Sequence, residues 1–450
     1  MSDRPLAEVA RTAVGLALDS GATDAECTIS EDDEFSVNVR MGDVENIKEA
    51  GSRGAGLRVL VGKRSGSSYT SDLSGDGIRQ MVASAMSIAG ITTEDPHAGL
   101  PESEEFGALE GDLGLYSDDV SRVETAAKVE RARAAEQAAF SVDPRITNSE
   151  GASLDSYVGN RIFANSGGFF GAYRSSSCSL SAVPVARSGD AMERDYWFSL
   201  ARGWSGLEPP EVVGRKAAER ALRRLGARKI PTCRAPVVFE PRTARSLLEN
   251  LFEAVCGDSI YRSASFLTGK LGQRVASESL TLIDDGTIPG LFGSSPFDDE
   301  GVPSRRTVVI ERGILQSYLL NTYTARKLGL KTTGNASRGL TGNASVGHGN
   351  FYLEKGSLTP EEIIRRAGTG LYVTELIGFG VNIVTGDYSR GAAGIWIEKG
   401  ELAYPVSGIT IAGNLKDMLT AVELIGSDLE FRGSTAAPTL MIREMTISGQ

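Results

Sequence analysis

The sequence predicts an α+β fold in two domains, and three observations support this class. The chain has 450 residues, 41% of them hydrophobic, so it is long enough to form more than one core. Apolar residues recur at helical spacing in some segments and alternate with polar residues in others. Beyond about residue 230 the composition shifts toward glycine and short apolar runs. We therefore expect an N-terminal α/β sandwich-like domain over residues 1–230 and a C-terminal, antiparallel β-rich domain with helices over residues 231–450.

The N-terminal half should combine helices with alternating strands. Its strand segments alternate with a period of two and are interrupted at glycines, whereas its helices have apolar residues three and four apart. A Ser-Asp cap and Pro-Pro-Glu mark two of the helix starts. The expected elements, in order, are a helix over 6–20, strands over 27–73, a helix over 74–88, a long helix over 117–140, strands over 153–202 and a helix over 210–225.

Short strands joined by tight turns are expected in the C-terminal half. Runs such as APVVFE, RTVVIERGILQSYLL, GIWIEKGELAYPV and APTLMIREMTI have the spacing of an antiparallel sheet. Within them, Glu311-Arg312-Gly313 and Glu398-Lys399-Gly400 have the composition of hairpin turns.

The segment RTARSLLENLFEAVCGD, residues 242–258, predicts an amphipathic helix. One apolar stripe, which must be buried, contains Ala244, Leu247, Leu248, Leu251, Phe252 and Val255. Arg245 and Glu249 stand four residues apart on the other face and can pair, which favours a solvated charged face. The alternative is a metal or acid–base site that uses Glu249 and Glu253, one turn apart.

Charge and composition narrow the range of partners. With 47 Lys and Arg against 58 Asp and Glu, the net charge is -11, so direct binding of nucleic acid is not expected. The amino terminus lacks the apolar core of a signal peptide, and no stretch reaches the ~18 apolar residues of a membrane span. Cysteine spacing without C-x-x-C indicates reduced thiols, and the residues concerned are Cys27, Cys178, Cys233 and Cys256. We expect a cytoplasmic protein without membrane contact.

Polar residues in loops supply the first candidate binding residues. The chain has only two histidines, His97 and His348, and neither has a second histidine at metal-ligand spacing. A hydrogen-bonding role is expected for both, and His348 is also a candidate for substrate contact. The pentapeptide TGNAS occurs twice, and its Asn335 and Asn343 lie in Gly-Asn turns that could present polar groups to a ligand.

An acidic loop supplies a second group of candidates. FDDEGVPSRR contains Asp298 and Glu300, whose carboxylates could hold Ca²⁺ or Mg²⁺. Carboxylates that bond only the backbone of their own turn are the commoner case.

The segment GDYSRGAAG is the preferred binding loop. It places Asp387, Tyr388 and Arg390 among small residues, as where a ligand or another backbone approaches closely. Tyr388 offers a flat ring with a hydroxyl, and Arg390 offers a rigid fork of donors. An Asp387–Arg390 pair that only fixes the turn is an equal alternative.

Three long segments resemble the TldD/PmbA family, which was first described as modulators of DNA gyrase. They are GSRGAGLRVLVGKRSGSSYTSDL near the amino terminus, residues 271–339 from LGQRVASESL to TTGNASRG, and residues 377–418 from IGFGVNIVTG to ITIAGNLKDM. GDYSRGAAG and ITIAGNLKDM resemble the PmbA branch, also called TldE, more closely than the TldD branch.

The resemblance implies a cytosolic TldD–TldE heterodimer that acts as a metalloprotease on unfolded or extended peptides. In the TldD subunit, the metal ligands belong to an H-E-x-x-x-H helix and to a cysteine near the carboxy terminus. The corresponding helix here contains LLENLFEAV without histidine, and the tail FRGSTAAPTLMIREMTISGQ lacks cysteine. The resemblance therefore implies that this chain has no metal site and no catalytic residues, and that zinc is bound by the TldD partner.

Peptides recognised irrespective of sequence are most easily bound as a strand added to a sheet edge. Two functions other than that of a protease subunit remain open. One is an independent hydrolase that uses carboxylates such as Asp298 and Glu300, and the other is a pure interaction protein for gyrase or another partner. A homodimer of the chain alone also remains open.

Overall fold

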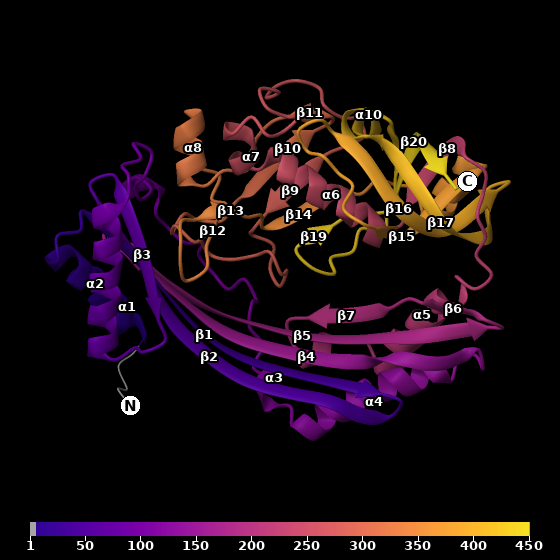
Figure 1. Ribbon diagram of the computed structural model, residues 1–450, viewed down its shortest axis with the longest axis horizontal. Helices are drawn as coiled ribbons and strands as arrows, with labels where there is room; N and C mark the ends of the chain where they lie inside the picture. The colour runs from indigo at the N-terminus through magenta and orange to yellow at the C-terminus, as the bar shows by residue number, and fades with distance from the viewer. Residues whose placement is uncertain (1–5, 450) are drawn as a thin grey trace.

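The computed structural model describes residues 6–449, and its combination of helices and sheets confirms the α+β class. Figure 1 shows two layers, with a long curved sheet from the N-terminal half below and the C-terminal half above its concave face. The N-terminal elements are α1 (Leu6–Asp19), β1 (Asp24–Arg40), β2 (Asp43–Val61), β3 (Arg64–Thr70), α2 (Gly75–Ile91), α3 (Asp119–Arg122), α4 (Thr125–Phe140), β4 (Ile146–Asn165), β5 (Phe170–Ser188), β6 (Ala191–Arg194), β7 (Trp197–Ala201) and α5 (Pro210–Leu222).

The first sheet is antiparallel and has the order β3-β2-β1-β4-β5-β6, with β7 also paired to β5. Its strands are long because alternation of buried and exposed residues continues over most of their length, as in the 19 residues of β5. Met41 and Gly42 have φ angles of 53° and 84°, which closes the β1–β2 hairpin with a two-residue turn. Helices α1 and α2 pack together against one end of the sheet, and α4 lies below it (Figure 1).

The expected long helix over residues 117–140 is two helices. Val123, between α3 and α4, is extended, and α4 is preceded by Glu124 rather than by a Ser-Asp cap. At the start of the short helix, the Asp119 carboxylate accepts hydrogen bonds from the backbone N–H groups of Trp204 and Ser205, both at 3.0 Å. These bonds attach the short helix to a distant turn, which the local sequence could not indicate.

The C-terminal half contains two larger sheets around one core. Its elements are β8 (Cys233–Phe239), α6 (Pro241–Val255), α7 (Gly257–Tyr261), β9 (Leu282–Asp285), β10 (Arg306–Glu311), β11 (Ile314–Leu315), α8 (Thr322–Leu328), β12 (Ala336–Ser337), β13 (Ser345–Val346), β14 (Asn350–Leu353), α9 (Pro360–Ala367), β15 (Gly370–Ile377), β16 (Asp387–Glu398), β17 (Glu401–Asn414), α10 (Leu415–Thr420), β18 (Val422–Ile425), β19 (Thr435–Ala436) and β20 (Leu440–Ser448). The proposed domain boundary near residue 230 lies between α5 and β8.

Strand pairing in the C-terminal half is mainly antiparallel, as predicted, with two exceptions. The orders are β11-β10-β9-β14-β19 and β17-β16-β15-β8-β20-β18, and an additional β17–β20 pairing closes five strands into a ring. The pairs β8–β15 and β14–β19 are parallel. The two predicted hairpin turns are confirmed, since Arg312 and Lys399 have positive φ and each precedes a glycine with positive φ.

Every helix within residues 6–449 is too short or too polar to span a lipid bilayer.

Candidate functional site

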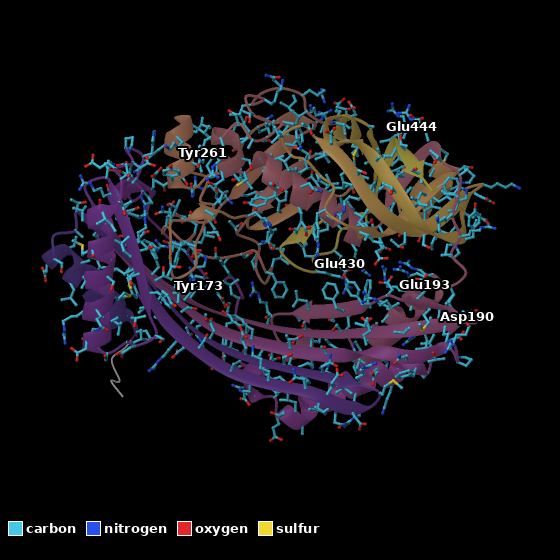
Figure 2. The ribbon with its side chains drawn as sticks, in the orientation of Figure 1. Tyr173, Asp190, Glu193, Tyr261, Glu430 and Glu444 are labelled. Carbon is cyan, nitrogen blue, oxygen red and sulfur yellow. The ribbon has the colours of Figure 1, made fainter. Side chains whose placement is uncertain are left out.

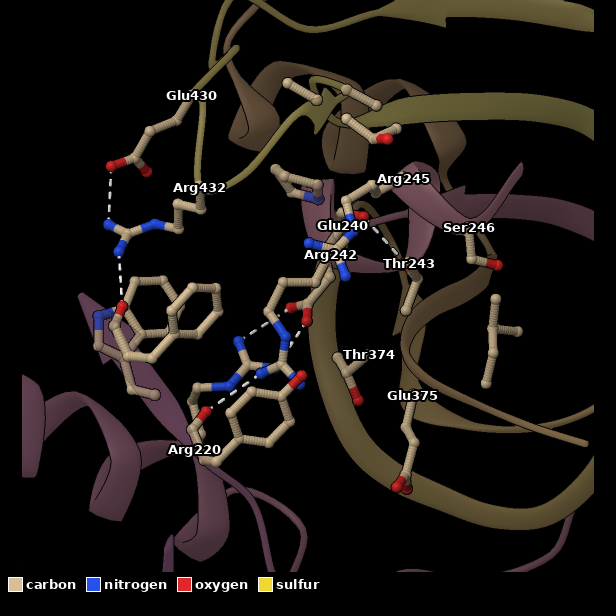
Figure 3. A pocket seen from close by; sticks show the side chains of 18 of the residues that line it. Arg220, Glu240, Arg242, Thr243, Arg245, Ser246, Thr374, Glu375, Glu430 and Arg432 are labelled. Atoms are coloured by element: carbon tan, nitrogen blue, oxygen red, sulfur yellow. Dashed lines mark hydrogen bonds and ion pairs between the residues drawn. The ribbon is translucent and has the colours of Figure 1, made fainter. Parts of the chain in front are cut away.

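The main cavity lies where the two halves meet. Its volume is about 480 Å³, within the range of small-ligand sites. One wall is formed by the start of β7 with Tyr196 before it, and by the end of α5 with Arg223 just after it. The start of α6, the ends of β15 and β16, and the segment around β19 form the others. Figure 3 shows this arrangement, and Figure 2 places Glu430, one of the lining residues, between the first sheet and the C-terminal half.

Helix α6 confirms the predicted amphipathic pattern. Leu248 and Leu251 are each 2% exposed, and the whole stripe is buried except for half-buried Phe252. On the other face, Arg245 Nε lies 3.4 Å from Glu249 Oε1, and both side chains are largely in solvent. The helix therefore has the charged, solvated face that the sequence favoured.

The helix and the C-terminal tail lie together at this cavity. Thr435, Ala436 and Ala437 of the tail line the cavity together with residues 241–243, 245 and 246 of α6. These segments correspond to the metal-binding segments named by the resemblance, but their donors do not fit zinc. Leu248 is in the core, Glu249 is paired with Arg245, and residues 431–437 contain neither thiolate nor imidazole. Within residues 6–449, no group of three or more His, Cys, Asp or Glu side chains is placed to hold a metal ion.

A buried network of arginines and carboxylates forms the wall near α5. Arg220 donates to Glu240 Oε1 at 2.6 Å, and its Nε lies 3.2 Å from Asp195 Oδ2. Arg223 also donates to Glu240, at 3.1 Å, and Arg242 donates to Asp195 Oδ1 at 3.2 Å. Burial alone would raise the pKa of Asp195, but the neighbouring arginines and the backbone N–H of Tyr196 together lower it below its ordinary value. This network holds α5, the start of α6 and the loop before β7 in fixed positions.

The segment GDYSRGAAG is a strand rather than the expected loop. Asp387 begins β16 and is exposed, and its carboxylate accepts hydrogen bonds from Thr385 Oγ1 at 2.7 Å and Asn414 Nδ2 at 3.1 Å. These hydrogen bonds lower the pKa of Asp387. Tyr388 is 1% exposed and belongs to the core, so its side chain cannot present a surface to a peptide. Alternation in a strand explains the error, because Tyr388 points inward between exposed neighbours.

Arg390 is the only member of that segment that lines the cavity. It is half-buried, and its Nη1 donates to Ser246 Oγ on α6 at 2.9 Å. The predicted alternative of an Asp387–Arg390 ion pair is absent among the described residues, whose ion pairs do not include Arg390.

The other candidate residues lie near a second cavity of about 140 Å³. Asn335 lines it but is 5% exposed, and its Nδ2 donates to Asp284 Oδ2 at 2.7 Å. Asn343 is exposed and does not line it. The two TGNAS repeats form a small hairpin through β12 and β13, in which Asn335 directly precedes β12 and Asn343 lies in the connecting loop.

His348 links α6 to the tail. Its ring lies edge-on to Phe252 with centroids 4.7 Å apart, and its Nε2 is 3.5 Å from Thr435 Oγ1. Its Nδ1 is 2.8 Å from the carbonyl oxygen of Gly349. These contacts agree with the predicted hydrogen-bonding role, and they place His348 between the second cavity and α6.

The carboxylates of the acidic loop bond backbone N–H groups, but these belong to distant segments as well as to their own turn, so the predicted arrangement is confirmed only in part. Asp298 Oδ1 accepts hydrogen bonds from the backbone N–H groups of Glu300 and Val302, and Oδ2 accepts one from Ala336, all at 2.9 Å. Glu300 Oε2 accepts from the N–H of Thr322 at 2.9 Å. Burial and the neighbouring Glu300 carboxylate raise the pKa of Asp298. Both Asp298 oxygens are thus occupied by backbone donors, which is a structural arrangement.

Several residues of the main cavity were missed from the sequence. Arg220, Glu240, Ser246 and Arg432 come from segments that are distant in sequence, and none belongs to a motif. The available signal was the density of arginine over residues 215–229, although such a run is more often a solvated helix face; Arg220 from that run is 9% exposed.

Sequence profiles of the PmbA/TldA metallopeptidase match three parts of the chain: domain 1 over residues 25–89, the central domain over 118–225 and the C-terminal domain over 232–449. The chain is also 41% identical to the metalloprotease PmbA of Escherichia coli O157:H7 over 446 residues, which cover 99% of this chain and 96% of that protein. The chain therefore belongs to the PmbA/TldD family of metallopeptidases, and the resemblance stated from the sequence is confirmed.

Two further comparisons extend this result. A metalloprotease TldD homologue of Haemophilus influenzae is 26% identical over 88% of this chain and 87% of its own length, and the same strain has a PmbA homologue that is 36% identical over 99% and 97%. The crystal structure of a Bacteroides thetaiotaomicron protein, proposed to modulate DNA gyrase, superposes with a TM-score of 0.91 at 28% identity, covering 98% of each chain.

Proposed function

We propose that this chain is the PmbA-type, or TldE-type, subunit of a cytoplasmic heterodimeric metalloprotease, and that a TldD-type partner holds the catalytic zinc. The observation that carries the proposal is the composition of α6 and the tail. Both segments line the same cavity, and neither contains a histidine or a cysteine. A hydrolytic zinc site needs three protein ligands and an open position for water. On α6, only the exposed carboxylates of Glu249 and Glu253 are near the corresponding positions.

Relatives support a paired assembly. Haemophilus influenzae has both a PmbA homologue and a TldD homologue, and this chain is more similar to the former. Two related chains of this kind can share one enclosed site, in which one chain supplies the metal and the other supplies part of the binding surface.

We further propose that this chain binds part of an unfolded or extended peptide at the main cavity. Strand β19 is the edge of the five-stranded sheet, and its Thr435 and Ala436 line the cavity, so an added peptide strand has main-chain groups beside it there. The edge of β7 on the opposite wall is less available. Arg242 and Arg432 donate to the carbonyl oxygens of Tyr196 and Phe198, at 3.1 and 2.7 Å.

Co-purification with a TldD-type chain tests the proposal. Both chains are expressed together with a tag on only one, and the complex is analysed by size exclusion with light scattering and then incubated with an unfolded peptide. We expect a complex with equal numbers of the two chains and cleavage that needs both of them. Cleavage by this chain alone would favour the independent hydrolase, and failure of the chains to associate would favour the pure interaction protein; either result would overturn the subunit assignment.

A further inference from the structure

The main cavity has an excess of positive charge. Six arginines and three glutamates line it, and the arginines come from α5, α6, β16 and the tail. The first turn of α6 also opens onto it, which adds the partial positive charge of a helix N-terminus. A cavity with this lining favours an anionic group over a neutral or cationic one.

Five of the six arginines have a carboxylate partner within the chain. Arg220 and Arg223 pair with Glu240, Arg242 with Asp195, Arg245 with Glu249, and Arg432 with Glu430. Figure 3 shows several of these pairs around the opening. Their charges are therefore largely compensated before any ligand binds.

Arg390 differs from the other five. Within residues 6–449 its only hydrogen-bond partner is Ser246 Oγ, and no carboxylate lies within ion-pair distance. Its Nε is buried without a hydrogen-bond partner, as are the Nε atoms of Arg220, Arg223 and Arg432, so the missing counter-charge is what distinguishes Arg390. A cation that is partly withdrawn from water without a counter-charge loses some of its hydration, and an anion entering the cavity would offset that loss.

The geometry of Arg390 and Ser246 suits a carboxylate. A guanidinium presents parallel N–H donors that match the two oxygens of a carboxylate. Because Ser246 Oγ accepts from Arg390, its own hydroxyl hydrogen is free to donate to a third group. Together the two side chains offer convergent donors at the wall of the cavity.

We propose that Arg390 and Ser246 form a carboxylate-binding site that takes the C-terminal carboxylate of a peptide, an inference that rests on the proposed peptide-binding function. A cavity of about 480 Å³ has the size of a small-ligand site, so it can hold the last residues of a peptide. A peptide paired along β19 can place its terminal carboxylate at Arg390, since both line the same cavity. An acidic side chain is the other source of the same chemical group.

The test measures peptide binding to the full-length chain by calorimetry. Three forms of one unfolded peptide are compared: a free C-terminal acid without internal acidic residues, its C-terminal amide, and the amide with one internal Glu. We expect the free acid to bind about 10- to 100-fold more tightly than the plain amide, the range for hydrogen bonds to a charged group. Equal binding of the acid and the plain amide, or no binding of either, would overturn the site. If the Glu-containing amide matched the free acid, the C-terminal assignment would be overturned.

Variants assign the effect to these residues. Arg390→Gln should abolish the preference for the free acid, and Ser246→Ala should reduce it severalfold. Arg443→Gln, which removes an arginine from the exposed pair with Glu423, is the control and should leave the preference unchanged. Retention of the full preference in Arg390→Gln would overturn the assignment. The comparison of acid and amide in the unmutated chain does not depend on whether a variant folds.

The outcome for this site can be separated from that for the subunit. A complex with the TldD-type chain that forms and cleaves, but binds and cleaves the acid and the amide equally well, would overturn the carboxylate site and leave the subunit assignment standing. If the chain prefers the free acid but does not associate with a TldD-type chain, the subunit assignment would be overturned and the carboxylate site would stand.

Discussion

Arg338 crosses from the C-terminal half into the first sheet, and its removal should destabilise the protein strongly. Its Nη1 donates to Glu26 Oε1, and its Nη2 donates to Thr28 Oγ1 at 3.2 Å. Glu26 also accepts from Arg58 Nη1 at 2.8 Å, and its side chain is completely buried. Although burial alone would raise the pKa of Glu26, the two arginines lower it, so the carboxylate is ionised in the folded protein at neutral pH.

Arg338→Met removes one of the two cations and keeps the apolar stem. Glu26 Oε2 already lacks a hydrogen-bond partner, so the variant leaves a buried carboxylate with only Arg58 beside it. Breaking a buried pair in this way costs about 3 to 5 kcal/mol, a large share of the ~5 to 15 kcal/mol that stabilises a typical domain.

Urea unfolding at pH 7, followed by circular dichroism, measures this cost. Arg443→Met is the matched control, because Arg443 and Glu423 form an ion pair with exposed side chains, 69% and 43% in solvent. We expect the control to lose less than about 1 kcal/mol. If Arg338→Met lost no more than the control, the buried pair would not contribute to holding the two halves together.

Two further predictions use the same unfolding assay. Leu251→Ala should cost about 2 to 5 kcal/mol, because Leu251 is 2% exposed within the core beneath α6, whereas Glu249→Gln should cost less than about 0.5 kcal/mol; the reverse order would contradict the assignment of the two faces. Burial raises the pKa of Asp284 to about 6, above its value of about 3.9 in an unfolded chain. Because the folded protein then binds this proton more tightly than the unfolded chain, the proton's contribution to the free energy of unfolding is complete below about pH 4 and is lost as the pH rises through 6. Asp284→Asn should therefore reduce the fall in unfolding free energy between pH 4 and 6.5, and an unchanged fall would refute the raised pKa.

Local sequence patterns predicted helices and turns better than they predicted strand pairing and contacts between distant segments. The stripe of α6 and the turns at Arg312 and Lys399 depend on residues close in sequence, and all three are confirmed. The short helix that the sequence merged into a longer one is attached through Asp119 to residues 204–205, about eighty-five positions later. The parallel pairs β8–β15 and β14–β19 likewise need the folded chain, because no local signal distinguishes a parallel from an antiparallel partner.

The candidate site shows the same limit. Glycine and serine around Tyr388 indicated a loop, although the alternation of Asp387, Tyr388 and Ser389 fits a strand with its aromatic residue inward. Arg390 was selected from the sequence, but its contact with Ser246 joins residues 144 positions apart. The composition of a segment could indicate which side chains carry hydrogen-bond donors. Whether each donor already has a partner within the chain could be seen only in the folded structure.

The most direct test of the proposed role is the metal content and peptidase activity of the isolated chain. The purified protein is analysed for zinc and other transition metals and incubated with an unfolded peptide, with and without chelator, before and after a TldD-type chain is added. We predict less than stoichiometric metal and no cleavage by the isolated chain, followed by chelator-sensitive cleavage once the partner is present. One tightly held transition metal per chain, with chelator-sensitive cleavage in the absence of any partner, would contradict this account.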